Sequence, residues 1–125
     1  MRSRRKPTDA ELAILRVLWT RGPSTVRDVA EAMGREGAYT TVLKLMQIMT
    51  EKGLIERDDS VRPQLYRPRH KQAQTQKHLL RDFLDRAYGG SVKALVMHAL
   101  SSKKPSQKDL DELEALLDRF EKEDV

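Results

Sequence analysis

The apolar residues near the start of the chain recur at the spacing of one helix face. They stand three or four positions apart, which predicts an amphipathic helix between residues 8 and 22. The stripe comprises Leu12, Leu15, Leu18 and Trp19. Thr8 precedes Glu11 by three residues, the spacing of an N-terminal capping box. Gly22 and Pro23 then indicate the end of this helix.

The same rhythm predicts two further helices. The second extends to Gly34 and is capped by Ser24 or Thr25, and its apolar positions are Val26, Val29, Ala30 and Met33. The third covers residues 38–53 and ends at Gly53. Its apolar face comprises Val42, Leu45, Met46 and Met49, with Leu43 beside them. Its opposite face is polar and presents Thr40, Thr41, Lys44 and Gln47.

A short alternating pattern follows the third helix. It predicts two strands, Leu54–Arg57 and Gln64–Arg67, which flank a loop rich in Asp, Ser and Pro. The expected hairpin has an exposed tip that carries Arg62.

After residue 70 the chain carries three more helical stripes. Ser106 and Asp109 form a capping-box pattern before the last of them. Three short helices cannot enclose these stripes alone, so we expect two copies of the chain to interleave them. The expected interface comprises Leu80, Phe83, Leu84, Leu95, Val96, Leu100, Leu113, Leu117 and Phe120. The alternative is a helical appendage that packs on its own N-terminal domain.

The order of elements predicts a mainly α fold with a small β-hairpin. Residues 1–70 have the layout of a winged helix-turn-helix DNA-binding domain, and residues 71–125 form a helical dimerisation domain. In such a domain the third helix lies in the DNA major groove. We therefore expect its polar face, Thr40, Thr41, Lys44 and Gln47, to reach base edges and phosphates, unless it is merely a wetted surface.

Three more side chains are candidates for DNA contact. Arg62 lies at the tip of the expected hairpin, which forms the wing, between Arg57 and Arg67 in the sequence. From there it could bind the adjacent DNA backbone or enter the minor groove. Tyr39 and Tyr66 could stack on sugar or phosphate, or lie partly buried with the hydroxyl outward.

The net positive charge of the chain lies entirely in its first part. Residues 1–70 carry 14 Lys and Arg against 9 Asp and Glu, whereas residues 71–125 carry 10 against 10. Such a basic half is typical of proteins that bind a polyanion, most commonly nucleic acid, through release of counterions. The alternative is ordinary solubility charge.

Composition excludes several other classes of function. The chain has no cysteine, which removes disulfides and thiolate metal sites and fits a reducing compartment. It has no run of about 18 apolar residues that would span a membrane, so we expect a cytoplasmic protein. His78 and Asp82 are four apart and could share a metal ion, but a solvated pair is favoured. With no phosphate loop or nucleophile motif, we expect neither an enzyme nor a cofactor.

These motifs resemble the penicillinase-repressor family of bacterial winged-helix regulators, the BlaI/MecI type, over nearly the whole chain. The most specific stretch is "AYTTVLKLMQIMTEKGLIER", and "TDAELAILRVLW", "STVRDVAEAM" and "SVKALVMHALSSKKPSQKDLDELEALLD" also match. The resemblance implies a homodimeric repressor of a palindromic operator on double-stranded DNA, with the C-terminal helices swapped into the dimer. It assigns DNA contact to Thr40, Thr41, Lys44 and the wing around Arg62.

The chain departs from the family pattern at three points. Many members have a basic residue where this chain has Ile48, and the copper-responsive branch ends in a cysteine cluster that is absent here. The β-lactam-responsive members are released when a sensor protease cuts an Asn-Phe bond in the dimerisation helices. The corresponding segment here reads Met97-His98-Ala99-Leu100, so release by proteolysis near His98 is an open hypothesis.

Two functions remain as alternatives at this point. The first is a homodimeric transcriptional repressor, and the second is a winged-helix protein–protein interaction module without sequence-specific DNA binding. Salt dependence separates them, since phosphate-driven binding weakens steeply as salt rises.

Overall fold

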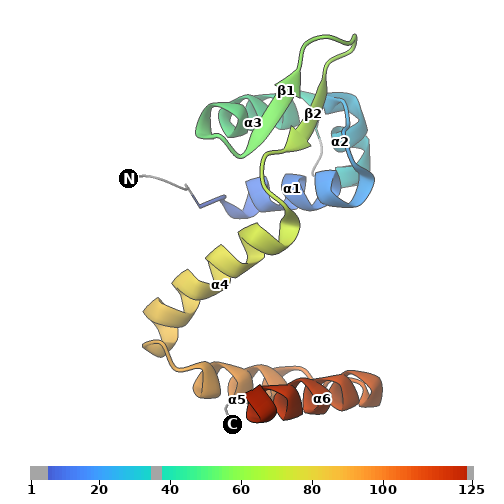
Figure 1. Ribbon diagram of the computed structural model, residues 1–125. Coiled ribbons are helices and arrows are strands. Elements are labelled where there is room, and N and C mark those ends of the chain that lie inside the picture. Colours follow the sequence, from blue (N-terminus) through green and yellow to red (C-terminus); the bar gives the residue numbers. More distant parts are fainter. Residues whose placement is uncertain (1–5, 35–37, 124–125) are drawn as a thin grey trace. The chain divides into compact units, whose positions relative to one another are not determined.

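The computed structural model describes residues 6–34 and 38–123, and this part of the chain contains six helices and one hairpin (Figure 1). The elements are α1 (Asp9–Arg21), α2 (Val26–Met33), α3 (Tyr39–Lys52), β1 (Ile55–Asp58), β2 (Leu65–Pro68), α4 (Gln72–Tyr88), α5 (Val92–Ser102) and α6 (Gln107–Glu123). The mainly α fold with a winged helix-turn-helix and a following helical region is confirmed. None of the described helices has the length and apolar character needed to cross a membrane.

Side-chain caps set the starts of α1 and α2. The amide of Glu11 donates to Thr8 Oγ1 at 3.2 Å and Glu11 Oε1 accepts from the Thr8 amide at 2.9 Å, which confirms the expected capping box. Thr25 and Asp28 form a second capping box: the amide of Asp28 donates to Thr25 Oγ1 at 3.0 Å, and the amide of Thr25 donates to Asp28 Oδ2 at 3.1 Å. Ser24 is buried and instead exchanges backbone hydrogen bonds with Tyr66 of β2. Of the two expected caps for α2, Thr25 is therefore the correct one.

The hairpin begins one residue later than the sequence pattern indicated. Gly53 has a φ of 81° in the left-handed region, where glycine is favoured, and its amide donates to the carbonyls of Met49 and Thr50. The amide of Leu54 also donates to Met49, at 2.9 Å. Leu54 thus completes the end of α3, and the antiparallel ladder runs from Ile55 opposite Pro68 to Asp58 opposite Leu65.

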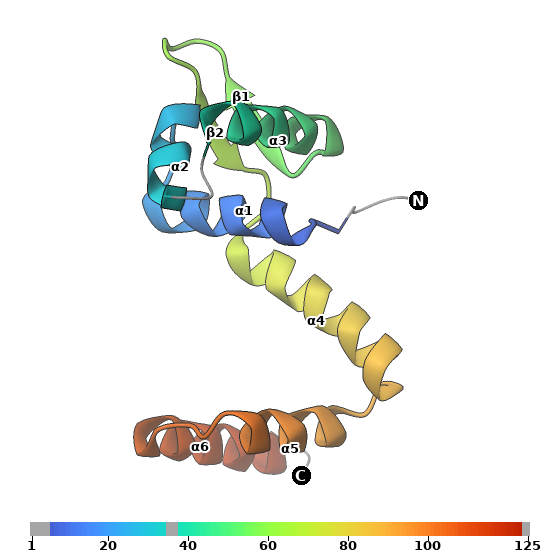
Figure 2. The same ribbon diagram turned by 180° about the vertical axis from the view of Figure 1, so that it is seen from behind.

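One core holds the first three helices and the hairpin together. Its buried apolar residues are Ile14, Leu15, Leu18, Val26, Val29, Ala30, Val42, Met46, Met49, Leu54, Ile55 and Tyr66. Ile14 was missing from the expected stripe of α1, whereas Leu12 and Trp19 pack at the edge of the core. Figures 1 and 2 show the hairpin lying against α3, with its loop projecting away from the three helices.

A buried ion pair joins α1 to the end of α3. Lys52 Nζ lies 2.8 and 3.0 Å from the two carboxylate oxygens of Glu11, which is only 2% exposed. Burial by itself raises the pKa of Glu11, but the hydrogen bonds from Lys52 and Thr8 and the charge of Lys52 together lower it below its ordinary value.

The three C-terminal helices enclose no core of their own. Not one residue of α4, α5 or α6 is buried. Ser91 Oγ accepts from the Ala94 amide to cap α5, and Ser106 Oγ accepts from the Asp109 amide at the start of α6, both at 3.1 Å. Local caps thus define the starts of α5 and α6, while none of the apolar side chains of the three helices is buried.

The chain divides into two compact units, Met1–Leu80 and Arg81–Val125. The first includes the segment between the hairpin and α4, where Trp19 Nε1 donates to the carbonyl of His70 at 3.1 Å. This bond ties the segment after the hairpin to α1. The expected functional boundary between residues 70 and 71, at the end of the hairpin, stays a prediction.

Candidate nucleic-acid interface

The polar face of α3 is exposed and its opposite face is anchored in the core. Val42, Met46 and Met49 are each 0% exposed, which holds the helix in one rotation about its axis. Thr40, Thr41, Lys44 and Gln47 are all exposed on the other side. Among the described residues, none of these four side chains makes a hydrogen bond or ion pair, so their donors and acceptors are available to a partner.

The two tyrosines have different environments. Tyr39 is 49% exposed in the first turn of α3, which suits a contact with a partner. Tyr66 is 3% exposed and belongs to the core under the hairpin. This burial agrees with the second alternative stated for Tyr66, a ring inside the fold, and leaves little of the ring to stack on nucleic acid.

The loop at the tip of the hairpin holds the side chain of Arg62 through backbone carbonyls. Arg62 Nη1 donates to the carbonyl oxygens of Asp59 at 2.7 Å and Val61 at 3.1 Å. Asp59 Oδ1 accepts from the side-chain Nε2 of Gln64 at 2.9 Å, which closes the loop from the other side. The guanidinium is exposed, and its remaining N–H donors are free to meet an anion.

The arginines on the two strands are paired with acids. Arg57 forms an ion pair with Asp59 at 2.7 Å, and the hydrogen bond and charge of Asp59 raise the pKa of Arg57. Arg67 lies 3.3 Å from Glu56 on the facing strand. These exposed pairs partly neutralise the wing, so the local field is weaker than a count of its arginines indicates.

A groove of about 290 Å³ lies where α2, α3 and the hairpin meet. Its lining residues are Thr25, Val26, Arg27, Tyr39, Leu43, Pro63, Gln64 and Tyr66. The guanidinium of Arg27 lies over the Tyr39 ring, 5.7 Å from the ring centroid, within the range of a cation–π contact. Sequence reasoning missed Arg27, because only the fold shows that the first turn of α2 adjoins α3.

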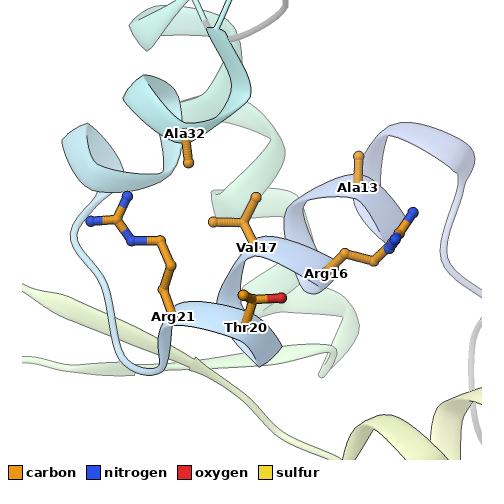
Figure 3. Close-up of a pocket in the computed structure, with 6 residues that line it drawn as sticks. All are labelled: Ala13, Arg16, Val17, Thr20, Arg21 and Ala32. Carbon is orange, nitrogen blue, oxygen red and sulfur yellow. The ribbon is translucent and has the colours of Figure 1, made fainter.

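A second, shallower depression of about 350 Å³ lies between α1 and α2 and is lined by Ala13, Arg16, Val17, Thr20, Arg21 and Ala32. Figure 3 shows the guanidinium groups of Arg16 and Arg21 on opposite sides of Val17. Arg21 also donates to the backbone carbonyl of Asp28 at 3.5 Å. The lining carries these two guanidinium groups and no carboxylate or imidazole.

The acid of the pair His78 and Asp82, noted in the sequence, has a basic partner on its own helix. Asp82 is ion-paired with Arg86 at 3.1 Å. No group of three or more metal-ligating side chains occurs within residues 6–34 and 38–123. His98 Nδ1 lies 3.1 Å from the Tyr88 hydroxyl, a partner that the sequence alone did not indicate.

Known proteins similar to this chain carry the names of transcriptional regulators. The chain is 36% identical to the transcriptional regulator BlaI of Mycobacterium tuberculosis over 94 residues, which are 72% of this chain and 68% of the relative. It is 21% identical to the penicillinase repressor of Bacillus licheniformis over 113 residues, 89% and 88% of the two chains.

The family assignment rests on a match across almost the whole chain. The model of the penicillinase repressor family matches residues 7–119, which include every described element of the winged helix and most of the C-terminal helices. The description of this family is that of a repressor, in agreement with the names of the two relatives. The resemblance seen in the sequence is thereby confirmed, and the chain belongs to the penicillinase repressor family.

Proposed function

We propose that this protein is a homodimeric transcriptional repressor that binds a palindromic operator on double-stranded DNA through α3 and the wing. The observation that carries the proposal is the polar row on α3. Thr40, Thr41 and Lys44 are exposed and unpaired among the described residues, while the buried face of the same helix fixes their direction. The short hydroxyls of the threonines, the side-chain amide of the neighbouring Gln47 and the flexible ammonium of the lysine are suited to hydrogen-bond base edges and phosphates.

The wing supplies the second contact in this proposal. The exposed guanidinium of Arg62 is held at the hairpin tip by two backbone carbonyls, which limits the entropy lost when it meets an anion. With α3 in the major groove, the projecting loop reaches the neighbouring backbone or minor groove. Tyr39, at the start of α3, is the aromatic contact that stays in the proposed set.

The homodimer is supported by the exposed apolar residues of the C-terminal helices. These helices bury no residue, and isolated helices of such length are marginal in water without a packed apolar face. Phe83, Leu117 and Phe120 are 49%, 60% and 57% exposed. We infer that a second copy covers these side chains and the rest of the expected interface: Leu80, Leu84, Leu95, Val96, Leu100 and Leu113.

Loss of this dimer is the proposed route of release. A cut by a sensor protease within α5, near His98, would detach α6 and the three interface residues that it carries. The winged helix would remain folded, because its core draws no residue from α5 or α6. Each DNA contact would then be monovalent, and the gain from bivalency would be lost. Such a repressor acts where the chromosome lies, in the bacterial cytoplasm.

Selection of genomic fragments by the purified full-length protein tests the repressor function. At near-physiological salt the wild type should enrich a palindrome with half-sites about one or two helical turns apart. Lys44→Ala should lose this enrichment, while Arg16→Ala, which removes one charge from the exposed face of α1, should keep it. DNA retention that depends on salt but not on sequence would contradict the proposal. Retention of a protein partner without DNA would favour an interaction module instead.

A further inference from the structure

Of the residues that line the groove between α2, α3 and the hairpin, only Tyr39 belongs to the contacts proposed so far. Its lining includes the apolar side chains of Val26, Leu43 and Pro63. It also includes Arg27 from α2 and Gln64 from the hairpin segment. All three elements that approach DNA in a winged helix therefore contribute to one concave surface.

Arg27 differs from the arginines of the wing in its partners. Arg57 and Arg67 are each ion-paired with a carboxylate, and Arg62 bonds to backbone carbonyls of its own loop. Arg27 is exposed and has no acidic partner among the described residues, and its contact is with the Tyr39 ring. Its full positive charge is consequently open to solvent, while the ring restricts where the guanidinium lies.

The geometry of the double helix indicates what enters this groove. A major groove and the minor groove next to it are separated by one sugar–phosphate strand. If α3 occupies the first and the wing reaches the second, that strand must cross the surface between them. This surface is the groove that α3 and the hairpin line together.

We propose that the groove seats one sugar–phosphate strand of the bound duplex, with Arg27 holding a phosphate and Tyr39 positioning Arg27. This inference rests on the proposed DNA-binding function. A guanidinium offers two parallel N–H donors to phosphate oxygens, a stronger and more directional contact than an ammonium makes. The apolar part of the lining matches the C–H surface of deoxyribose. Because neither group reads a base, the contact positions the protein and adds affinity without specifying sequence.

The test measures affinity against salt for two duplexes, one carrying the selected palindrome and one of scrambled sequence and equal length. Arg27→Ala should weaken binding to both duplexes by about tenfold. It should also reduce the slope of log affinity against log salt by about one per subunit. Tyr39→Leu should produce part of this loss and Tyr39→Phe should restore it, because the ring and not the hydroxyl faces the guanidinium.

Arg16→Ala is the matched control, since it removes the same charge from α1 without touching the groove. Thermal melting of each variant shows whether the fold is kept. Equal slopes for Arg27→Ala and Arg16→Ala would overturn the phosphate contact, and equal affinities of Tyr39→Leu and Tyr39→Phe would overturn the positioning role. If the wild type itself shows no preference for the palindrome, the proposed repressor function is wrong. This result is distinct from the comparison of salt slopes, which tests only the phosphate contact of Arg27.

Discussion

At the scale of single residues, the stability of the winged helix depends on the pair formed by Glu11 and Lys52. We expect Lys52→Met to lower the free energy of unfolding by about 3 kcal/mol, because Glu11 stays buried without its counter-charge. In the wild type the pKa of Glu11 is lowered by folding, so its ionised carboxylate stabilises the fold at any pH above the ordinary pKa of glutamate. This stabilisation is lost as the pH falls through the pKa of Glu11 in the folded state. In the variant, burial raises that pKa, so the deficit should shrink at acidic pH. Urea unfolding over a pH series measures both effects.

The double variant Glu11→Gln with Lys52→Met serves as the control. Glutamine retains the hydrogen bond to the Thr8 amide but carries no charge to be buried. It should recover part of the stability lost in Lys52→Met. A deficit that does not change with pH would contradict the assignment to a buried charge.

At the scale of elements, α2 depends on its cap. It has only eight residues, too few to be stable alone, and Thr25 Oγ1 accepts from the Asp28 amide at its start. The hydrogen bonds from the Thr25 backbone and side chain also lower the pKa of Asp28. We expect Thr25→Ala to cost about 1 kcal/mol of stability in chemical denaturation.

Two threonine variants show whether this cost arises from the cap. Thr25→Ser keeps the accepting oxygen and should remain close to wild type. Thr20→Ala changes an exposed threonine inside α1, where alanine is the better helix former, and should be neutral or slightly stabilising. If both alanine variants lose the same stability, the cap is not the cause.

At the scale of the whole molecule, the proposed function requires two copies. Leu117 is 60% exposed in α6, so a charged replacement leaves the winged-helix core untouched. We expect Leu117→Glu to convert the dimer to a monomer in sedimentation velocity. Affinity for the full palindrome should fall by about 10²-fold or more as bivalency is lost, while affinity for a single half-site is unchanged.

Leu117→Met preserves the apolar volume and should sediment as the wild type does. A wild type that sediments as a monomer at the concentration where it retains the palindrome would contradict the dimer. So would a Leu117→Glu variant that remains dimeric.

Much of the fold was predictable because its signals are local. The capping box at Thr8, the glycine that ends α3 and the apolar spacing of each helix act within a few residues, so a single sequence displays them. The fold class follows from the order of these elements, and the family resemblance from the sequence motifs that they contain. For the same reason the exposed row Thr40, Thr41 and Lys44 could be named in advance.

The remaining details depend on contacts between distant residues. Local pattern cannot choose between Ser24 and Thr25 as a cap, and the choice is made by the backbone bridge from Ser24 to Tyr66. Nor does it reveal that the ring of Tyr66 is needed in the core, or that Arg27 lies over Tyr39.

By itself, then, the sequence determined the elements, the faces of the helices and the basic character of the first 70 residues, because propensity, periodicity and charge are properties of neighbouring positions. Only the tertiary structure decided which candidates are buried, which arginines are already paired with acids, and where a groove opens between α2, α3 and the wing. Burial, ion pairing and concavity arise when segments far apart in the chain pack together, and no local pattern encodes that packing.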